Sequence, residues 1–161
     1  MEENADEMRL LQMYLPDLHS PDVRKRSKAV IQIGHNYGAI AEIVHLSRED
    51  PSDHVRLMAA VCLNEEQMDA IVECTNDSSE KIVWTACRKI GIWGDHSHIP
   101  LLELLVPDDR WHVSFDACLA LFRITEDTKW LIKCYDILKF KDVPILYDLL
   151  PEIGNNPTAT T

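Results

Sequence analysis

Residues 82–105 read IVWTACRKIGIWGDHSHIPLLELL, and this stretch decides the fold that we expect. In its first half, Ile82, Ala86 and Ile90 recur at spacing four, which places them on one stripe of an α-helix. In its second half, large aliphatic residues recur at spacing three from Ile99 to Leu105, which is also a helical spacing. The stretch therefore predicts two helices joined by a short turn.

Both patterns recur along the chain. A β-branched residue, a small residue and an Ile or Leu occupy the first, fifth and ninth positions of four stripe segments, at 23–31, 55–63, 82–90 and 113–121. Apolar residues at spacing three form four triplet segments, starting at Ile40, Met68, Ile99 and Leu131. The two series alternate with a period of about 30 residues, which is typical of stacked helical hairpins. We therefore predict an all-α, right-handed α-solenoid of about four to five hairpins.

The second hairpin differs from the others in length. Only 13 residues separate Val55 from Met68, whereas 17 or 18 separate the equivalent positions elsewhere. The difference is close to one helical turn. We therefore expect the helix that ends near Leu63 to be truncated.

The pattern resembles the HEAT family of repeats, within the armadillo-like helical superfamily. RKIGIWGDHSHIPLLELL is similar to the turn and following helix of the short HEAT-like repeats of phycobilisome lyases, and Asp22-Val23-Arg24 and His54-Val55-Arg56 look like repeat starts. The resemblance covers about residues 5–140. It implies a protein-binding scaffold whose stripe helices line the inner, concave face.

Composition excludes several classes of protein. The chain has 161 residues and a net charge of −11, which disfavours nucleic acid and anionic membranes as partners. It carries no apolar run long enough to span a membrane and no basic leader, so we expect a cytoplasmic or nuclear protein. Its five cysteines form no CxxC motif and fit reduced, buried thiols. We expect one domain over residues 1–154 and a disordered tail at 155–161.

Catalytic and metal motifs are not apparent in the sequence. His96 and His98 lack further ligands at a fixed spacing, and His54 and His112 are two repeats apart. We therefore expect no enzyme activity, no cofactor and no metal. The alternatives are an enzyme subunit on a HEAT-like scaffold, such as a chromophore lyase, and a truncated piece of a longer array.

The candidate site is the polar flank of the stripe segments. Arg24, Lys25 and Lys28 form a dense basic cluster in an acidic chain, which favours an acidic peptide or helix of a partner protein. Later segments extend this candidate partner-binding set with Arg56, Trp84, Arg88 and Phe115. The competing interpretations are a solvated charged face and packing of Trp84 and Phe115 between hairpins.

A second candidate contact lies near the end of the chain. Residues 143–150 are apolar on more than one face and are followed by Pro151. A terminal repeat needs a polar outer face. We therefore expect this segment to dock against a partner or to mediate self-association.

Overall fold

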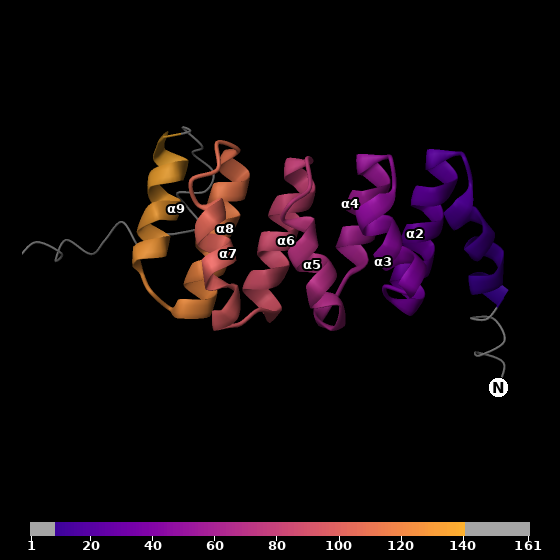
Figure 1. Ribbon diagram of the computed structural model, residues 1–161, viewed down its shortest axis with the longest axis horizontal. Helices are drawn as coiled ribbons and strands as arrows, with labels where there is room; N and C mark the ends of the chain where they lie inside the picture. The colour runs from indigo at the N-terminus through magenta and orange to yellow at the C-terminus, as the bar shows by residue number, and fades with distance from the viewer. Residues whose placement is uncertain (1–8, 141–161) are drawn as a thin grey trace, which may run out of the picture. The chain divides into compact units, whose positions relative to one another are not determined.

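The computed structural model describes residues 9–140, and every regular element in this range is a helix (Figure 1). The predicted all-α class is confirmed for these residues. Contacts divide the chain into two compact units, unit 1 (residues 1–89) and unit 2 (residues 90–161). The predicted docking segment at 143–150 and the predicted tail at 155–161 lie outside the described residues.

Unit 1 alternates the two predicted kinds of helix. Its elements after residues 9–14, which are helical, are η1 (Leu15–His19), α2 (Val23–Tyr37), α3 (Ala41–Glu49), α4 (Asp53–Cys62), η2 (Glu65–Gln67), α5 (Met68–Cys74) and the first part of α6 (Glu80–Trp93). The stripe helix α4 packs against the stripe helix α2 and the triplet helix α3, and α3 also packs against α5. The predicted truncation is confirmed, because α4 has 10 residues and α2 has 15.

Unit 2 continues the same alternation. It contains the remainder of α6, η3 (His96–His98), α7 (Ile99–Leu105), α8 (Trp111–Thr125) and α9 (Lys129–Phe140). The stripe helix α8 packs against the triplet helices α7 and α9.

Two glycines lie inside helices rather than at helix ends. Gly38 does end α2, with a φ of 75°, but Gly34 lies within α2 and Gly91 within α6. A Cβ atom at Gly91 would lie 2.8 Å from the Cα atom of Ala120, so only glycine lets α6 approach α8 this closely. The interior glycines therefore serve helix packing rather than helix termination.

The core consists of the predicted stripes and triplets in all but the first stripe segment. Val55, Ile82 and Val113 are fully buried, as are the triplet residues Ile43 and Ile71. The five cysteines are free thiols, four of them buried and Cys62 half-buried. Burial raises the pKa of Cys74 to about 11, so this thiol stays protonated at neutral pH.

A side-chain turn precedes each stripe helix. The Asp50 carboxylate accepts a hydrogen bond from the Ser52 N–H at 2.8 Å. Before the other three stripe helices, the same i to i+2 bond is made by the side chains of Ser20, Asp77 and Asp108. These turns satisfy backbone donors that would otherwise be exposed at a helix start.

Two arginines, Arg26 buried and Arg56 half-buried, join these turns to the preceding stripe helices. Arg26 donates to both carboxylate oxygens of Asp50, at 2.6 and 2.9 Å, and to the Ser20 carbonyl at 2.8 Å. Arg56 repeats the arrangement one hairpin later, with Asp77 at 2.7 and 3.0 Å and the Asp50 carbonyl at 2.9 Å. Each guanidinium therefore links the turn before its own helix to the turn before the next stripe helix.

This equivalence corrects the alignment of the first stripe segment. Because Arg26 and not Arg24 matches Arg56, the first repeat is displaced by two positions from the predicted register. Val23 and Ile31, predicted as core, are 38% and 44% exposed. The buried stripe of α2 runs instead along Arg26, Ala29, Val30 and Ile33.

The ion pairs also set the ionisation of their carboxylates. Burial by itself disfavours the charged form of Asp50, but the Arg26 guanidinium and the Ser52 N–H outweigh it and hold the pKa of Asp50 below its ordinary value. The pKa of Asp77 is lowered against burial in the same way by Arg56 and the Ser79 N–H. Both carboxylates are therefore charged at neutral pH.

Replacing Asp50 with Ala tests the structural role of the ion pair. We expect the free energy of unfolding to fall by about 3 kcal/mol, because the Arg26 guanidinium is left buried without its carboxylate. The measurement is urea denaturation at neutral pH. Glu73→Ala is the matched control, since Glu73 pairs with Arg48 at an exposed site in the same unit, and it should change stability little. Equal losses in the two variants would contradict the assignment.

Acidification tests the same carboxylates. Their native pKa values lie below those of the unfolded chain, so the unfolded state binds more protons in acid. The stabilisation is complete above the unfolded value of about 4 and is lost as the pH falls through the native pKa values.

We expect the unfolding free energy to decrease on acidification below about pH 4, and the decrease to be smaller in the double variant Asp50→Asn, Asp77→Asn. Urea denaturation at several pH values measures both slopes. Parallel pH profiles for the two proteins would show that other groups are responsible.

Candidate functional site

The exposed face of α2 carries an unusual row of cations. Asp22 caps the helix by accepting from the Arg24 N–H at 2.8 Å, and the next residues present Arg24, Lys25 and Lys28 to solvent. We call these three side chains the α2 cationic row. The side chains of Arg24 and Lys25 form no hydrogen bond or ion pair with any residue in the range 9–140, and the Lys28 ammonium lies 5.7 Å from the centre of the Tyr14 ring.

Arg56, a further predicted site residue, is held in a structural contact. Its guanidinium is committed to Asp77 and to the Asp50 carbonyl, and its side chain is 14% exposed. Burial opposes the charge, but the Asp77 carboxylate raises the pKa of Arg56 overall. Arg56 therefore contributes to repeat register, and a role in partner binding stays a prediction.

Trp84 and Arg88 lie together on α6. The Arg88 guanidinium is 5.8 Å from the centre of the Trp84 ring, which is a cation–π distance, and Trp84 is half-buried. The neighbouring Lys89 donates to the carbonyls of Val61 at 3.0 Å and Leu63 at 2.6 Å. Its ammonium therefore anchors α6 beside the end of α4, and burial lowers the pKa of Lys89.

Phe115 belongs to unit 2. It is half-buried on α8, and its carbonyl accepts a weak hydrogen bond at 3.7 Å from the thiol of Cys134 on α9. The structure thus groups the α2 cationic row on one helix and Trp84 with Arg88 on another, both in unit 1.

Charge is segregated between the two kinds of helix in unit 1. The stripe helices, α6 being taken up to residue 89, carry only two acidic residues, Asp53 and Glu80. Their cations are Arg24, Lys25, Arg26, Lys28, Arg56, Lys81, Arg88 and Lys89. The elements α3, η2 and α5 carry the opposite balance, with Arg48 as their cation and Glu42, Glu49, Glu65, Glu66, Asp69 and Glu73 as their anions. Arg26 and Arg56 are paired with carboxylates and Lys89 is bonded to carbonyls, so the exposed cations of this layer are Arg24, Lys25, Lys28, Lys81 and Arg88.

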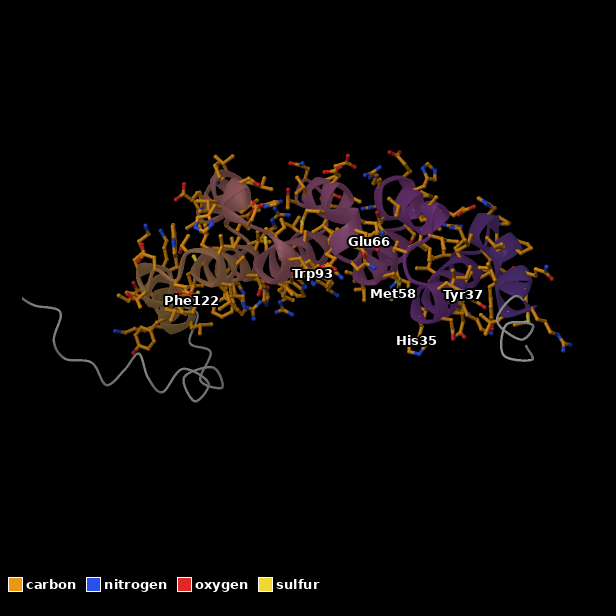
Figure 2. All side chains as sticks on the ribbon, turned by 90° about the horizontal axis from the view of Figure 1, so that it is seen from below. His35, Tyr37, Met58, Glu66, Trp93 and Phe122 are labelled. Atoms are coloured by element: carbon orange, nitrogen blue, oxygen red, sulfur yellow. The ribbon has the colours of Figure 1, made fainter. Side chains whose placement is uncertain are left out.

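The structure also reveals an apolar groove between α2 and α4 that the sequence analysis missed. It has a volume of about 380 Å³ and is lined by Ile31, Gly34, His35, Met58, Val61 and Cys62. Figure 2 shows His35 and Met58 along the same edge of unit 1. In the corrected register Ile31 and Val61 occupy equivalent positions, five residues after Arg26 and Arg56. The correct alignment would therefore have shown two apolar residues at matching positions of neighbouring stripe helices.

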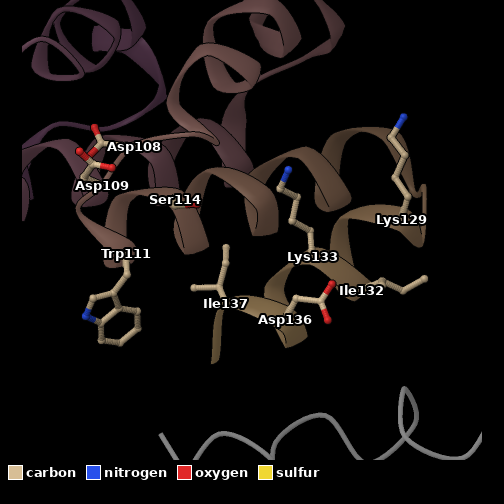
Figure 3. Close-up of a pocket in the computed structure, with 9 residues that line it drawn as sticks. All are labelled: Asp108, Asp109, Trp111, Ser114, Lys129, Ile132, Lys133, Asp136 and Ile137. Atoms are coloured by element: carbon tan, nitrogen blue, oxygen red, sulfur yellow. The ribbon is translucent and has the colours of Figure 1, made fainter. Parts of the chain in front are cut away.

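A larger cleft of about 690 Å³ lies in unit 2 between α8 and α9 (Figure 3). Its lining mixes acids, lysines and apolar groups: Asp108, Asp109, Trp111, Ser114, Lys129, Ile132, Lys133, Asp136 and Ile137. Asp108 is engaged by Arg110 at 2.7 Å, and Lys129 by Asp127 at 2.9 Å. The two paired groups are thus already neutralised, and the cleft has no dominant charge.

Residues 9–140 contain no cluster of three or more His, Cys, Asp or Glu side chains placed to hold one metal ion. Within the same range, no helix combines the length and apolar character needed to cross a bilayer.

Comparison with known proteins identifies the type of fold. No family model and no curated protein matches the sequence. Among solved structures, a designed armadillo repeat protein is similar with a TM-score of 0.50 and 20% identity, over 86% of this chain and 74% of that protein. The likeness at this identity concerns the fold alone, and it supports the hairpin alternation described above. The chain has an all-α solenoid fold of armadillo-like helical repeats.

Proposed function

We propose that this chain is a non-enzymatic protein-interaction scaffold that binds an acidic segment of a partner protein through the stripe helices of unit 1. The segregation of charge carries the proposal, because an acidic chain gathers exposed cations on one helical layer. Arg24 and Lys25 support it most directly, since their charges are not neutralised by any described residue. Armadillo-like repeat folds commonly serve as such scaffolds.

The class of partner follows from electrostatics. A local cationic surface accelerates the encounter with an acidic segment and disfavours basic ones. The net charge of −11 repels a long polyanion such as nucleic acid over distances beyond the surface itself. A short acidic stretch of protein is the ligand that satisfies both conditions.

Two finer assignments accompany the proposal. We infer HEAT-like rather than armadillo-type repeats, because each described repeat has two α-helices, joined in two repeats by a three-residue 3-10 turn, whereas armadillo units have three helices. We also infer a cytoplasmic or nuclear location, which fits five cysteines that are free thiols.

Reversing the charge of the α2 cationic row tests the proposed function. The variant is Arg24→Glu, Lys25→Glu, Lys28→Glu, and affinity capture from native lysate compares it with the wild type. We expect the wild type to retain a discrete protein that the variant loses, because the attraction becomes repulsion. Raised ionic strength should release the same protein from the wild type.

The control is a second triple reversal with the same change of net charge, at exposed cations of unit 2. Arg123→Glu, Lys133→Glu, Lys139→Glu alters α8 and α9 and should retain the partner. Circular dichroism checks that both variants keep the helical content of the wild type. Retention of the partner by the α2 variant, or its loss from both variants, would refute the assigned surface.

A further inference from the structure

The α2–α4 groove is apolar where its surroundings are charged. Ile31 is 44% exposed and Val61 is 54% exposed, and both belong to the lining of the groove. Apolar side chains that are exposed singly are common on protein surfaces, whereas exposed ones that line the same groove form a candidate contact surface. Because the two residues are equivalent in the repeat, the groove is built at matching positions on neighbouring stripe helices.

Gly34 and Cys62 shape the floor of this groove. A Cβ atom at Gly34 would come within 2.9 Å of the Cβ atom of Cys62, so a larger residue at position 34 would force α2 and α4 apart. The Cys62 thiol lies 3.8 Å from the Val30 carbonyl, which it reaches as a weak donor. The Cys62 thiol therefore donates its hydrogen bond within the fold, and the floor of the groove is apolar.

Cations flank the groove on both sides. Lys28 precedes Ile31 by three residues and is exposed on the same face of α2. On the other side, Arg88 occupies in α6 the repeat position that Ile31 and Val61 occupy in α2 and α4. The bond from Lys89 to the Val61 carbonyl fixes that part of α6 next to the end of α4.

We propose that the α2–α4 groove binds an acidic amphipathic helix. One or two large apolar side chains of the ligand insert between Ile31, Met58 and Val61, and its flanking carboxylates face Lys28 and Arg88. Charge complementarity selects this occupant, because a purely acidic segment leaves the apolar lining in water and a basic helix meets like charges. The inference rests on the proposed function and assigns the class of partner segment to that surface.

A defined peptide probe tests the groove directly. The probe is a fluorescein-labelled synthetic helix with leucines on one stripe and glutamates beside it. One control peptide has the same composition in an order without a stripe, and a second replaces the glutamates by glutamine. Fluorescence anisotropy with the full chain measures the dissociation constant. We expect the striped acidic peptide to bind more tightly than either control.

Variants at exposed positions then distinguish apolar contact within the groove from attraction by the surrounding charges. Val61→Asp should weaken the binding of the striped peptide by about tenfold or more, because it places a carboxylate in the apolar contact. Ile132→Asp on α9 is the matched control, because Ile132 is 53% exposed, and it should leave binding unchanged. Lys28→Glu should also weaken binding and reduce its dependence on salt.

The outcomes distinguish this inference from the proposed function. If binding depends on Lys28 and is insensitive to Val61→Asp and to the leucine stripe, the cationic surface stands and the groove assignment is wrong. A second outcome is that neither glutamate-containing peptide binds, while the charge-reversed α2 variant still loses its captured partner. That result would refute the acidic helix as the ligand of the groove but not the proposed function as a scaffold. Self-association of the chain that Val61→Asp abolishes would replace the acidic helix by a second copy as the occupant.

Discussion

The buried contact between the Arg26 guanidinium and the Asp50 carboxylate, repeated between Arg56 and Asp77, fixes the geometry of unit 1. Each arginine binds the turn before its own helix and the turn before the next stripe helix. Two charges are costly to bury, and bidentate geometry with additional carbonyl contacts offsets that cost. The pairs thereby determine which face of α2 and α4 points inward, and so which residues remain for binding.

The same register explains how a cationic layer and an apolar groove coexist. With Arg26 turned into the core, the remaining cations of α2 face solvent, and the exposed stripe continues through Ile31. Gly34 allows α4 to lie close enough for Val61 and Met58 to complete the groove. The proposed binding by charge and the proposed binding by shape therefore depend on the same structural constraint.

Sequence patterns predicted the helices, their alternation and the truncation of α4, because burial imposes a helical period that is visible without any partner. They failed at the first repeat. The sequence Val23-Arg24 resembles Val55-Arg56. An alignment that is wrong by two positions therefore still pairs an apolar residue with an apolar residue at both ends of the segment. Which of the four neighbouring cations of α2 turns into the core depends on Asp50, which is 24 residues away from Arg26. Helical periodicity carries no information on such a contact. The same error hides the groove, since the predicted register places Ile31 in the core.

Site-specific photo-crosslinking in the native cell tests the central claim, that the stripe-helix layer of unit 1 is the partner-binding surface. A photoreactive amino acid would be placed at Val61 in the groove, at Glu66 in the acidic element η2, and at Ile132 in unit 2. We predict one discrete adduct from position 61, located on an acidic helical segment of the partner, and none from positions 66 and 132. Adducts from position 66 with none from position 61 would contradict it, because they would place the partner on the acidic elements instead.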